Sequence, residues 1–93
     1  MRITELMWDD SNVGHIARHR VNPHEVEDIC FDPHISVKSE LHKYVLSGQT
    51  QTGRYINVVV ERVDKEIFRP ITAFGMSENY KKAYKRRMGR RDR

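Results

Sequence analysis

Cysteine is scarce in this sequence, and its scarcity excludes several classes of protein. Cys30 is the only cysteine among 93 residues, so an intrachain disulfide and a site built from several cysteine ligands are excluded. The sequence also has no low-complexity linker, no signal-peptide pattern and no apolar run of the roughly 20 residues that a membrane-spanning helix needs. We therefore expect one small cytoplasmic domain without membrane contact.

The motifs of familiar catalytic and nucleotide-binding sites are absent as well. No Walker loop, GxGxxG, GxSxG, CxxC or HExxH pattern occurs. His15 and His19 lie four residues apart, which suits a metal on one helix face, but zinc needs three or four ligands and no third is evident. We predict neither a metal nor a cofactor. His19 is better explained as a packed side chain, or as a general acid–base group in a cleft.

Basic residues are concentrated at the C-terminal end of the chain. Residues 81–93 hold eight lysines and arginines against one aspartate, whereas residues 1–80 carry nine basic and twelve acidic side chains. A basic block beside a slightly acidic body suits a polyanion or an acidic partner protein, although such blocks are about as often solubilising tails. We place a single domain at residues 1–88 and a basic tail at residues 89–93.

Local signals predict two helices early in the chain. Asn22, Pro23 and Glu25 fit the N-cap, the first helical residue and the reciprocal carboxylate of a capping box. That helix should end before Pro33, because the residue preceding a proline avoids the helical region. Apolar residues at helical spacing predict an earlier helix over residues 11–19, preceded by several candidate N-caps.

From residue 34 the hydrophobic period changes to two, which predicts strands. Pro70 removes a backbone donor and is expected at a bulge or an unpaired edge. Ser77 is expected to cap a last helix that stops at Gly89. Helices and strands are thus segregated in the order β-α-α-β-β-β-β-α, which favours the α+β class. The predicted strands are 2–8, 34–39, 42–48, 54–63 and 66–74.

Basic residues also recur along the predicted strands. Arg54 and Arg62 share one face of the strand over 54–63, and Arg69 is expected to share a face with Ala73. Lys43 begins another strand. Each of these charges, taken singly, is best explained as a solvated charge at the rim of the sheet. Together they can form a phosphate-binding face, since arginine meets phosphate with a planar fork and lysine with a point charge.

Four segments occur in an order and spacing that resemble a known family. The run W-x6-HIARH-x-V-x-P-x-EVE covers Trp8–Glu27, and YVLSGQTQTGRYINVVVE covers Tyr44–Glu61. RPITA at Arg69–Ala73 and M-S-E-x3-K-x-Y at Met76–Tyr84 complete the series. Through their order, and nearly over the whole chain, these segments resemble the BrnT-type toxins of type II toxin–antitoxin systems.

The resemblance implies a RelE/ParE-like fold with two N-terminal helices, an antiparallel sheet of four to five strands and a C-terminal helix. It implies a metal-independent endoribonuclease that cleaves RNA and arrests growth. A cognate antitoxin would hold the toxin inactive, and operator DNA would be bound only through their complex. The candidate catalytic residues are His19, Arg54, Arg69 and Tyr84. The candidate RNA- or phosphate-binding residues are Lys43 from the resemblance, with Arg62 and Lys81 added for their charge.

One departure from the family pattern keeps other functions open. Many BrnT-type toxins carry one or two arginines directly after the segment that corresponds to RPITA, where this chain has Phe74 and Gly75. An arginine there would help to hold phosphate. Its absence favours the alternative of a catalytically degenerate module that contacts a partner protein or nucleic acid through its basic end. A ParE-like inhibitor of a protein target is a third alternative.

Overall fold

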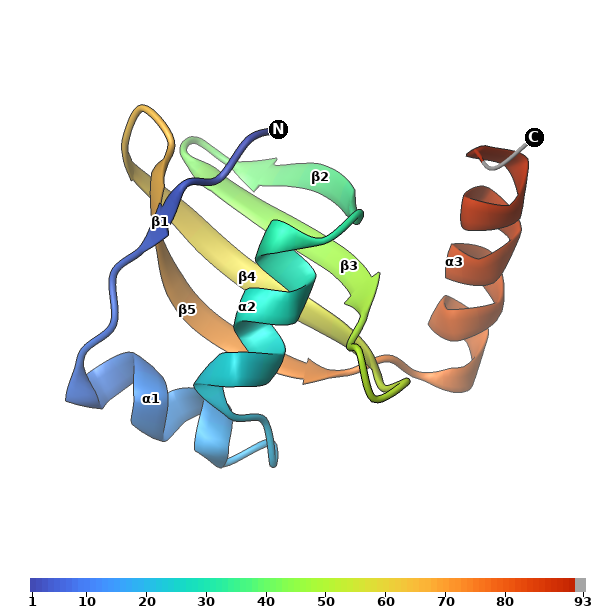
Figure 1. Cartoon of the computed structure of the whole chain (residues 1–93), viewed down its shortest axis with the longest axis horizontal. Coiled ribbons are helices and arrows are strands. Elements are labelled where there is room, and N and C mark those ends of the chain that lie inside the picture. Colours follow the sequence, from blue (N-terminus) through green and yellow to red (C-terminus); the bar gives the residue numbers. More distant parts are fainter. Residues whose placement is uncertain (92–93) are drawn as a thin grey trace.

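The computed structural model describes the backbone of residues 1–91 and the side chains of residues 1–89. In this part of the chain a five-stranded sheet is combined with three helices (Figure 1). The elements are β1 (Glu5–Leu6), α1 (Asp10–Ala17), α2 (Pro23–Phe31), β2 (Ile35–Glu40), β3 (Lys43–Gln49), β4 (Tyr55–Asp64), β5 (Ile67–Gly75) and α3 (Glu78–Arg91).

The strands lie in the order β1-β5-β4-β3-β2. Strands β2 to β5 form an antiparallel meander, while β1 pairs with β5 in parallel. The α+β prediction is therefore confirmed. The predicted element order β-α-α-β-β-β-β-α is confirmed as well. The resemblance implied two helices at the start and an antiparallel sheet, and this expectation is wrong, because the strand β1 precedes α1 and pairs with β5 in parallel. The hairpins leave one edge of β5 open, and β1 fills that edge in the same direction as β5.

Both N-terminal helices begin with a capping box. In α1 the Asp9 carboxylate accepts from the Asn12 backbone N–H, and the Asn12 side chain accepts from the Asp9 backbone N–H, each at 2.9 Å. Asn22 and Glu25 make the same exchange in α2, as predicted. Such boxes satisfy backbone donors that lie outside the helical hydrogen-bond ladder. The first helix ends at Ala17 rather than at residue 19, since the backbone turns through a left-handed conformation at Arg20.

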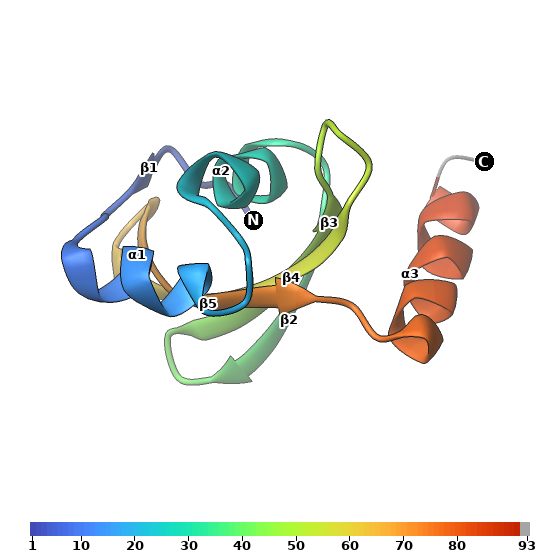
Figure 2. The same ribbon diagram turned by 90° about the horizontal axis from the view of Figure 1, so that it is seen from below.

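The main core lies between α1, α2 and one face of the sheet (Figure 2). Gly48 in β3 allows α2 to approach the sheet closely, because a Cβ there would lie 3.1 Å from the Ile29 Cδ1 atom. Helix α2 thus packs directly on the middle of the sheet. The buried residues of this core are Ile3, Ile16, Val21, Val26, Ile29, Cys30, Leu46, Ile56, Val58, Val60, Phe68 and Ala73.

The proline in β5 lies at a bulge, as predicted. Val60 pairs with Pro70 and Val59 pairs with Thr72, so the register shifts between these pairs. Because of this shift, the expectation that Arg69 and Ala73 lie on the same face of β5 is wrong. Arg69 pairs with Glu61, whereas Ala73 belongs to the core face, so these two residues do not share a face. An inserted residue reverses the alternation of side chains beyond it.

Helix α3 begins after Ser77, whose hydroxyl accepts from the Tyr80 backbone N–H at 3.2 Å. Tyr84 and Met76 are buried with Ile35 in a second, smaller core. The predicted stop at Gly89 is wrong, because α3 continues to Arg91. A single exposed glycine costs a helix only about 1 kcal/mol and need not end it. Residues 92–93 of the predicted tail lie outside the described residues.

We expect the Asn12→Ala substitution to lower the free energy of unfolding by about 3 kcal/mol. Asn12 is fully buried, and its amide nitrogen donates to the carbonyls of Met7 at 2.9 Å and Pro70 at 3.0 Å. Alanine would leave these carbonyls without their donor. Urea denaturation measures the change. The neighbouring exposed control, Ser11→Ala, should alter stability by no more than about 0.5 kcal/mol. Equal stability of the two variants would contradict the role assigned to Asn12.

Candidate functional site

The structure divides the predicted site residues among three places. One is a basic corner, which we define as Arg18, His19, Arg20 and Arg54, where the α1–α2 connection meets the start of β4. The second is the far end of the sheet, where Lys43, Arg62 and Arg69 lie. The third is the inner side of α3, which carries Lys81 and Tyr84.

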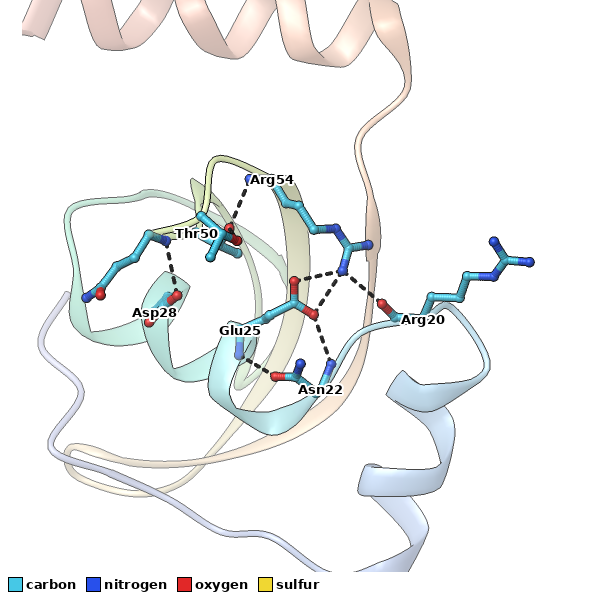
Figure 3. A network of polar contacts seen from close by, with 8 residues as sticks. Arg20, Asn22, Glu25, Asp28, Thr50 and Arg54 are labelled. Carbon is cyan, nitrogen blue, oxygen red and sulfur yellow. Dashed lines mark hydrogen bonds and ion pairs between the residues drawn. The ribbon is translucent and has the colours of Figure 1, made fainter.

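In the basic corner, Arg54 ties β4 to the N-terminal end of α2 (Figure 3). Its Nη1 donates to the Arg20 carbonyl at 2.8 Å and to the two Glu25 carboxylate oxygens at 2.9 and 2.7 Å. The Arg54 backbone N–H donates to Thr50 Oγ1 at 2.9 Å, which fixes the loop before β4. Glu25 therefore serves twice, in the capping box of α2 and as the partner of Arg54.

The geometry leaves one edge of the Arg54 guanidinium available. All three side-chain contacts use Nη1, while Nε and Nη2 have no partner among the described side chains. In Figure 3 Nη2 points away from Glu25. His19 is exposed, and its ring meets Phe74 edge-on at a centroid distance of 6.2 Å. The α1–α2 loop thus carries an exposed imidazole, and Arg54, which contacts this loop through the Arg20 carbonyl, keeps a guanidinium edge that can bind an anion.

The far end of the sheet also holds its cations beside carboxylates. Lys43, Glu61 and Arg69 are opposite one another on three neighbouring strands. Arg69 also forms an ion pair with Asp9, with Nη2 and Oδ2 2.9 Å apart. Lys43 lies 3.8 Å from Glu40. These basic residues therefore have carboxylate neighbours.

Arg62 lies at the same end of the sheet and packs on the core side. Its guanidinium carbon is 5.8 Å from the Tyr44 ring centroid and 5.0 Å from that of Phe68. Its Nη1 donates to the Lys65 carbonyl at 2.8 Å and closes the β4–β5 turn. These contacts support the hairpin.

The strand cations do not gather into the single phosphate-binding face that was expected of Lys43, Arg54 and Arg69, and Lys43 and Arg69 lie far from His19 as well. Arg54 precedes β4, while Lys43 and Arg69 are opposite Glu61 near the other end of that strand. The seven residue steps of extended chain from Arg54 to Glu61 separate these points by roughly 20–25 Å. Only His19 and Arg54 are brought to one corner, since Arg54 binds the carbonyl of the residue after His19.

Helix α3 combines aromatic rings with lysines. The Tyr84 ring is buried and meets the Tyr55 ring edge-on at 5.9 Å. The ammonium groups of Lys81 and Lys85 lie 5.4 and 5.0 Å from the centroid of Tyr55. Lys81 also pairs with Glu78 at 3.3 Å. Tyr84 therefore contributes to packing, and the cations of α3 surround an aromatic pair.

Sequence reasoning missed one polar cluster on the side of the sheet that faces α3. Ser47 Oγ donates to Asn57 Oδ1 at 2.7 Å and lies 2.9 Å from the Tyr80 hydroxyl. The sequence does contain a sign of this cluster, because Ser47 and Asn57 are polar residues within otherwise apolar strand segments. Their pairing, however, depends on the β3–β4 register, which the sequence does not specify.

Nowhere in residues 1–89 do three histidine, cysteine, aspartate or glutamate side chains gather into a group that could hold a metal ion. Within the described part of the chain, no helix has the length and apolar character needed to cross a membrane.

Comparisons with known proteins give no match: no protein-family model, no curated protein and no solved structure matches this chain.

The ion pair at the start of α1 makes stability depend on pH. A hydrogen bond from the Asn12 backbone and another from Arg69 hold the pKa of Asp9 below its usual value of 3.8. A lowered folded-state pKa gives stability that is present above pH 3.8 and is lost as the pH falls through the folded pKa. The Asp9→Asn variant should therefore show a shallower fall of the thermal midpoint between pH 5 and pH 2 than the unchanged protein. Identical slopes would contradict this account.

Cys30 is expected to be chemically inert in the folded protein. Burial, with a smaller effect of the Glu27 charge, raises the pKa of the Cys30 thiol to about 12. At pH 8 alkylation by iodoacetamide should be at least about a thousandfold slower than in the urea-unfolded chain, because the thiolate is the reactive form. Mass spectrometry over time measures both rates. Comparable rates in the two states would show that the thiol is accessible in the folded protein.

Proposed function

We propose that this chain is a metal-independent endoribonuclease, the toxin of a type II toxin–antitoxin system with a BrnT-like and RelE/ParE-like character. The observation that carries the proposal is the contact of Arg54 with the Arg20 carbonyl, which joins a guanidinium to the loop that bears the exposed His19. The order of the sequence segments supports the same conclusion. The cations of α3 supply additional attraction for a polyanion.

The chemistry proposed for this corner is attack by a ribose 2′-hydroxyl on the adjacent phosphate. His19 takes the 2′ proton, and a bond forms between the 2′-oxygen and phosphorus. The free edge of Arg54 stabilises the charge that develops on the non-bridging oxygens. The bond from phosphorus to the 5′-oxygen breaks, and water protonates that oxygen. The products are a 2′,3′-cyclic phosphate and a 5′-hydroxyl end.

Arg69, Lys43 and Tyr84, which were predicted as site residues, take no part in the chemical step of this proposal. Arg69 and Lys43 lie roughly 20–25 Å from the corner, at a distance suited to the backbone of a longer RNA rather than to the chemical step. Tyr84 orders α3 through its ring contact with Tyr55.

Partners follow from the same resemblance. We propose that an acidic antitoxin binds the toxin in the cytoplasm, and that operator DNA is contacted only through their complex. The run of lysines and arginines on α3 is suited to an acidic partner.

One observation favours the alternative of a binding module without catalysis. His19 packs edge-on against Phe74, the position at which the resemblance leads one to expect an arginine. Arg54 already neutralises Glu25. With both groups occupied in this way, the corner can bind phosphate without cleaving it. RNA binding that is never followed by cleavage would establish this alternative.

Cleavage of RNA by the purified protein tests the proposal. We expect His19→Ala to reduce the rate at least about a hundredfold, because general acid–base groups contribute that much. A chelator should leave the rate unchanged. His15→Ala is the matched control, since it removes an exposed imidazole one turn earlier on α1, and it should stay within about twofold.

Arg54 is tested with two variants, because Arg54→Ala also removes a structural tie. Arg54→Lys keeps a positive charge but loses the second donor edge. Both variants should cleave RNA at least about tenfold more slowly, and circular dichroism verifies that they are folded. If folded His19 and Arg54 variants cleave RNA as fast as His15→Ala does, the proposed active site is wrong.

A further inference from the structure

A small pocket lies between α3 and the sheet, on the face opposite α1 and α2. We call it the α3 pocket. Its volume is about 210 Å³, which is below the roughly 300–1,000 Å³ of sites for drug-sized ligands and is suited to a single ring system. Its lining is Ile35, Ser47, Tyr80, Ala83, Tyr84 and Arg87.

The polar groups of the α3 pocket are arranged to accept hydrogen bonds. Ser47 is buried, and its one hydroxyl proton is donated to Asn57 Oδ1 at 2.7 Å. The Tyr80 hydroxyl, 2.9 Å from Ser47 Oγ, must therefore be the donor in that contact. Both hydroxyl protons are thus engaged, so lone pairs on the Tyr80 and Ser47 oxygens remain for a ligand. A ligand that donates a hydrogen bond is favoured over one that accepts.

The walls and the surroundings of the α3 pocket indicate the rest of the ligand. Ile35 and the Tyr84 ring supply apolar surface, and Arg87 adds a cationic side chain to the lining. Lys81 and Lys85 lie nearby over the ring of Tyr55. Aromatic rings combined with several cations are characteristic of proteins that bind single-stranded nucleic acid, in which bases stack and phosphates meet the charges.

We propose that the α3 pocket binds one base of single-stranded RNA and prefers a base with an exocyclic amino group. The amino group of cytosine or adenine donates to the Tyr80 and Ser47 oxygens. A carbonyl oxygen in its place, as in uracil or hypoxanthine, brings lone pairs against lone pairs. Arg87 contacts the phosphate of the same nucleotide. The inference rests on the proposed function only in taking RNA as the natural ligand.

Matched pairs of nucleotides test the preference without requiring catalysis. The full chain is titrated with cytidine and uridine 5′-monophosphates and with adenosine and inosine 5′-monophosphates. Within each pair an exocyclic amino group is replaced by a carbonyl oxygen, and the adjacent ring nitrogen gains a proton. Inorganic phosphate is the control ligand. We expect the amino-bearing member of each pair to bind roughly three- to tenfold more tightly, as one hydrogen bond allows. Backbone amide signals of Ser47 and Ala83 should shift in NMR spectra.

Three variants locate the effect. Tyr80→Phe keeps the ring and removes the hydroxyl, so the preference within each pair should fall toward one. Ala83→Leu should fill the α3 pocket and weaken binding of all four nucleotides. Arg87→Ala should weaken all four about equally, whereas Lys82→Ala, an exposed α3 control outside the pocket lining, should have little effect.

The outcomes separate this proposal from the proposed function. Equal binding within each pair, or shifts that inorganic phosphate reproduces, would overturn the α3 pocket as a base site even if the protein cleaves RNA. Selective binding that Tyr80→Phe abolishes would support the α3 pocket even if no RNA is ever cleaved. A preference that is unchanged in Tyr80→Phe would show that another surface distinguishes the bases.

Discussion

Asn12 joins three elements that are distant in the sequence, and the first half of the fold depends on it. Its side-chain oxygen Oδ1 accepts from the Asp9 backbone N–H in the capping box of α1. Its side-chain nitrogen Nδ2 donates to the carbonyl of Met7 after β1 and to that of Pro70 in β5. Pro70 lies at a bulge, beyond the residues that β1 pairs with, so its carbonyl needs a partner from elsewhere. One buried side chain thus makes a bulge, a two-residue strand and a helix start mutually compatible.

Arg54 likewise joins distant elements, at the other end of β4, where it connects the start of this strand to α2 and to the loop before it. Asn12 is buried and its groups are saturated, whereas Arg54 uses only Nη1 for its structural contacts. A guanidinium has five donors, so a structural tie at one corner leaves the opposite edge for an anion. Arg69 and Lys43 have carboxylate neighbours in Asp9 and Glu40, just as Arg54 has Glu25. Pairing with a carboxylate therefore does not distinguish the basic corner, whereas the exposed His19 on the loop that Arg54 contacts does.

Local features of the fold were predictable, while long-range ones were not. The Asn22–Pro23–Glu25 box follows from contacts within one helical turn, and the structure confirms it. The parallel pairing of β1 could not be inferred, because it depends on which edge the meander leaves open. The bulge at Pro70 was expected, but its effect on the faces of Arg69 and Ala73 requires the register. For the same reason the basic residues were assigned to one surface, although the strand separates them.

Strand geometry relates the basic corner to the α3 pocket. Arg54 and Tyr55 are consecutive, and consecutive side chains of a strand point to opposite faces. Arg54 therefore reaches α2 on one side, while Tyr55 meets Tyr84 of α3 on the other. The two places lie back to back at the same end of β4. If both proposals hold, the base site and the phosphate site are positioned by two consecutive residues, Arg54 and Tyr55.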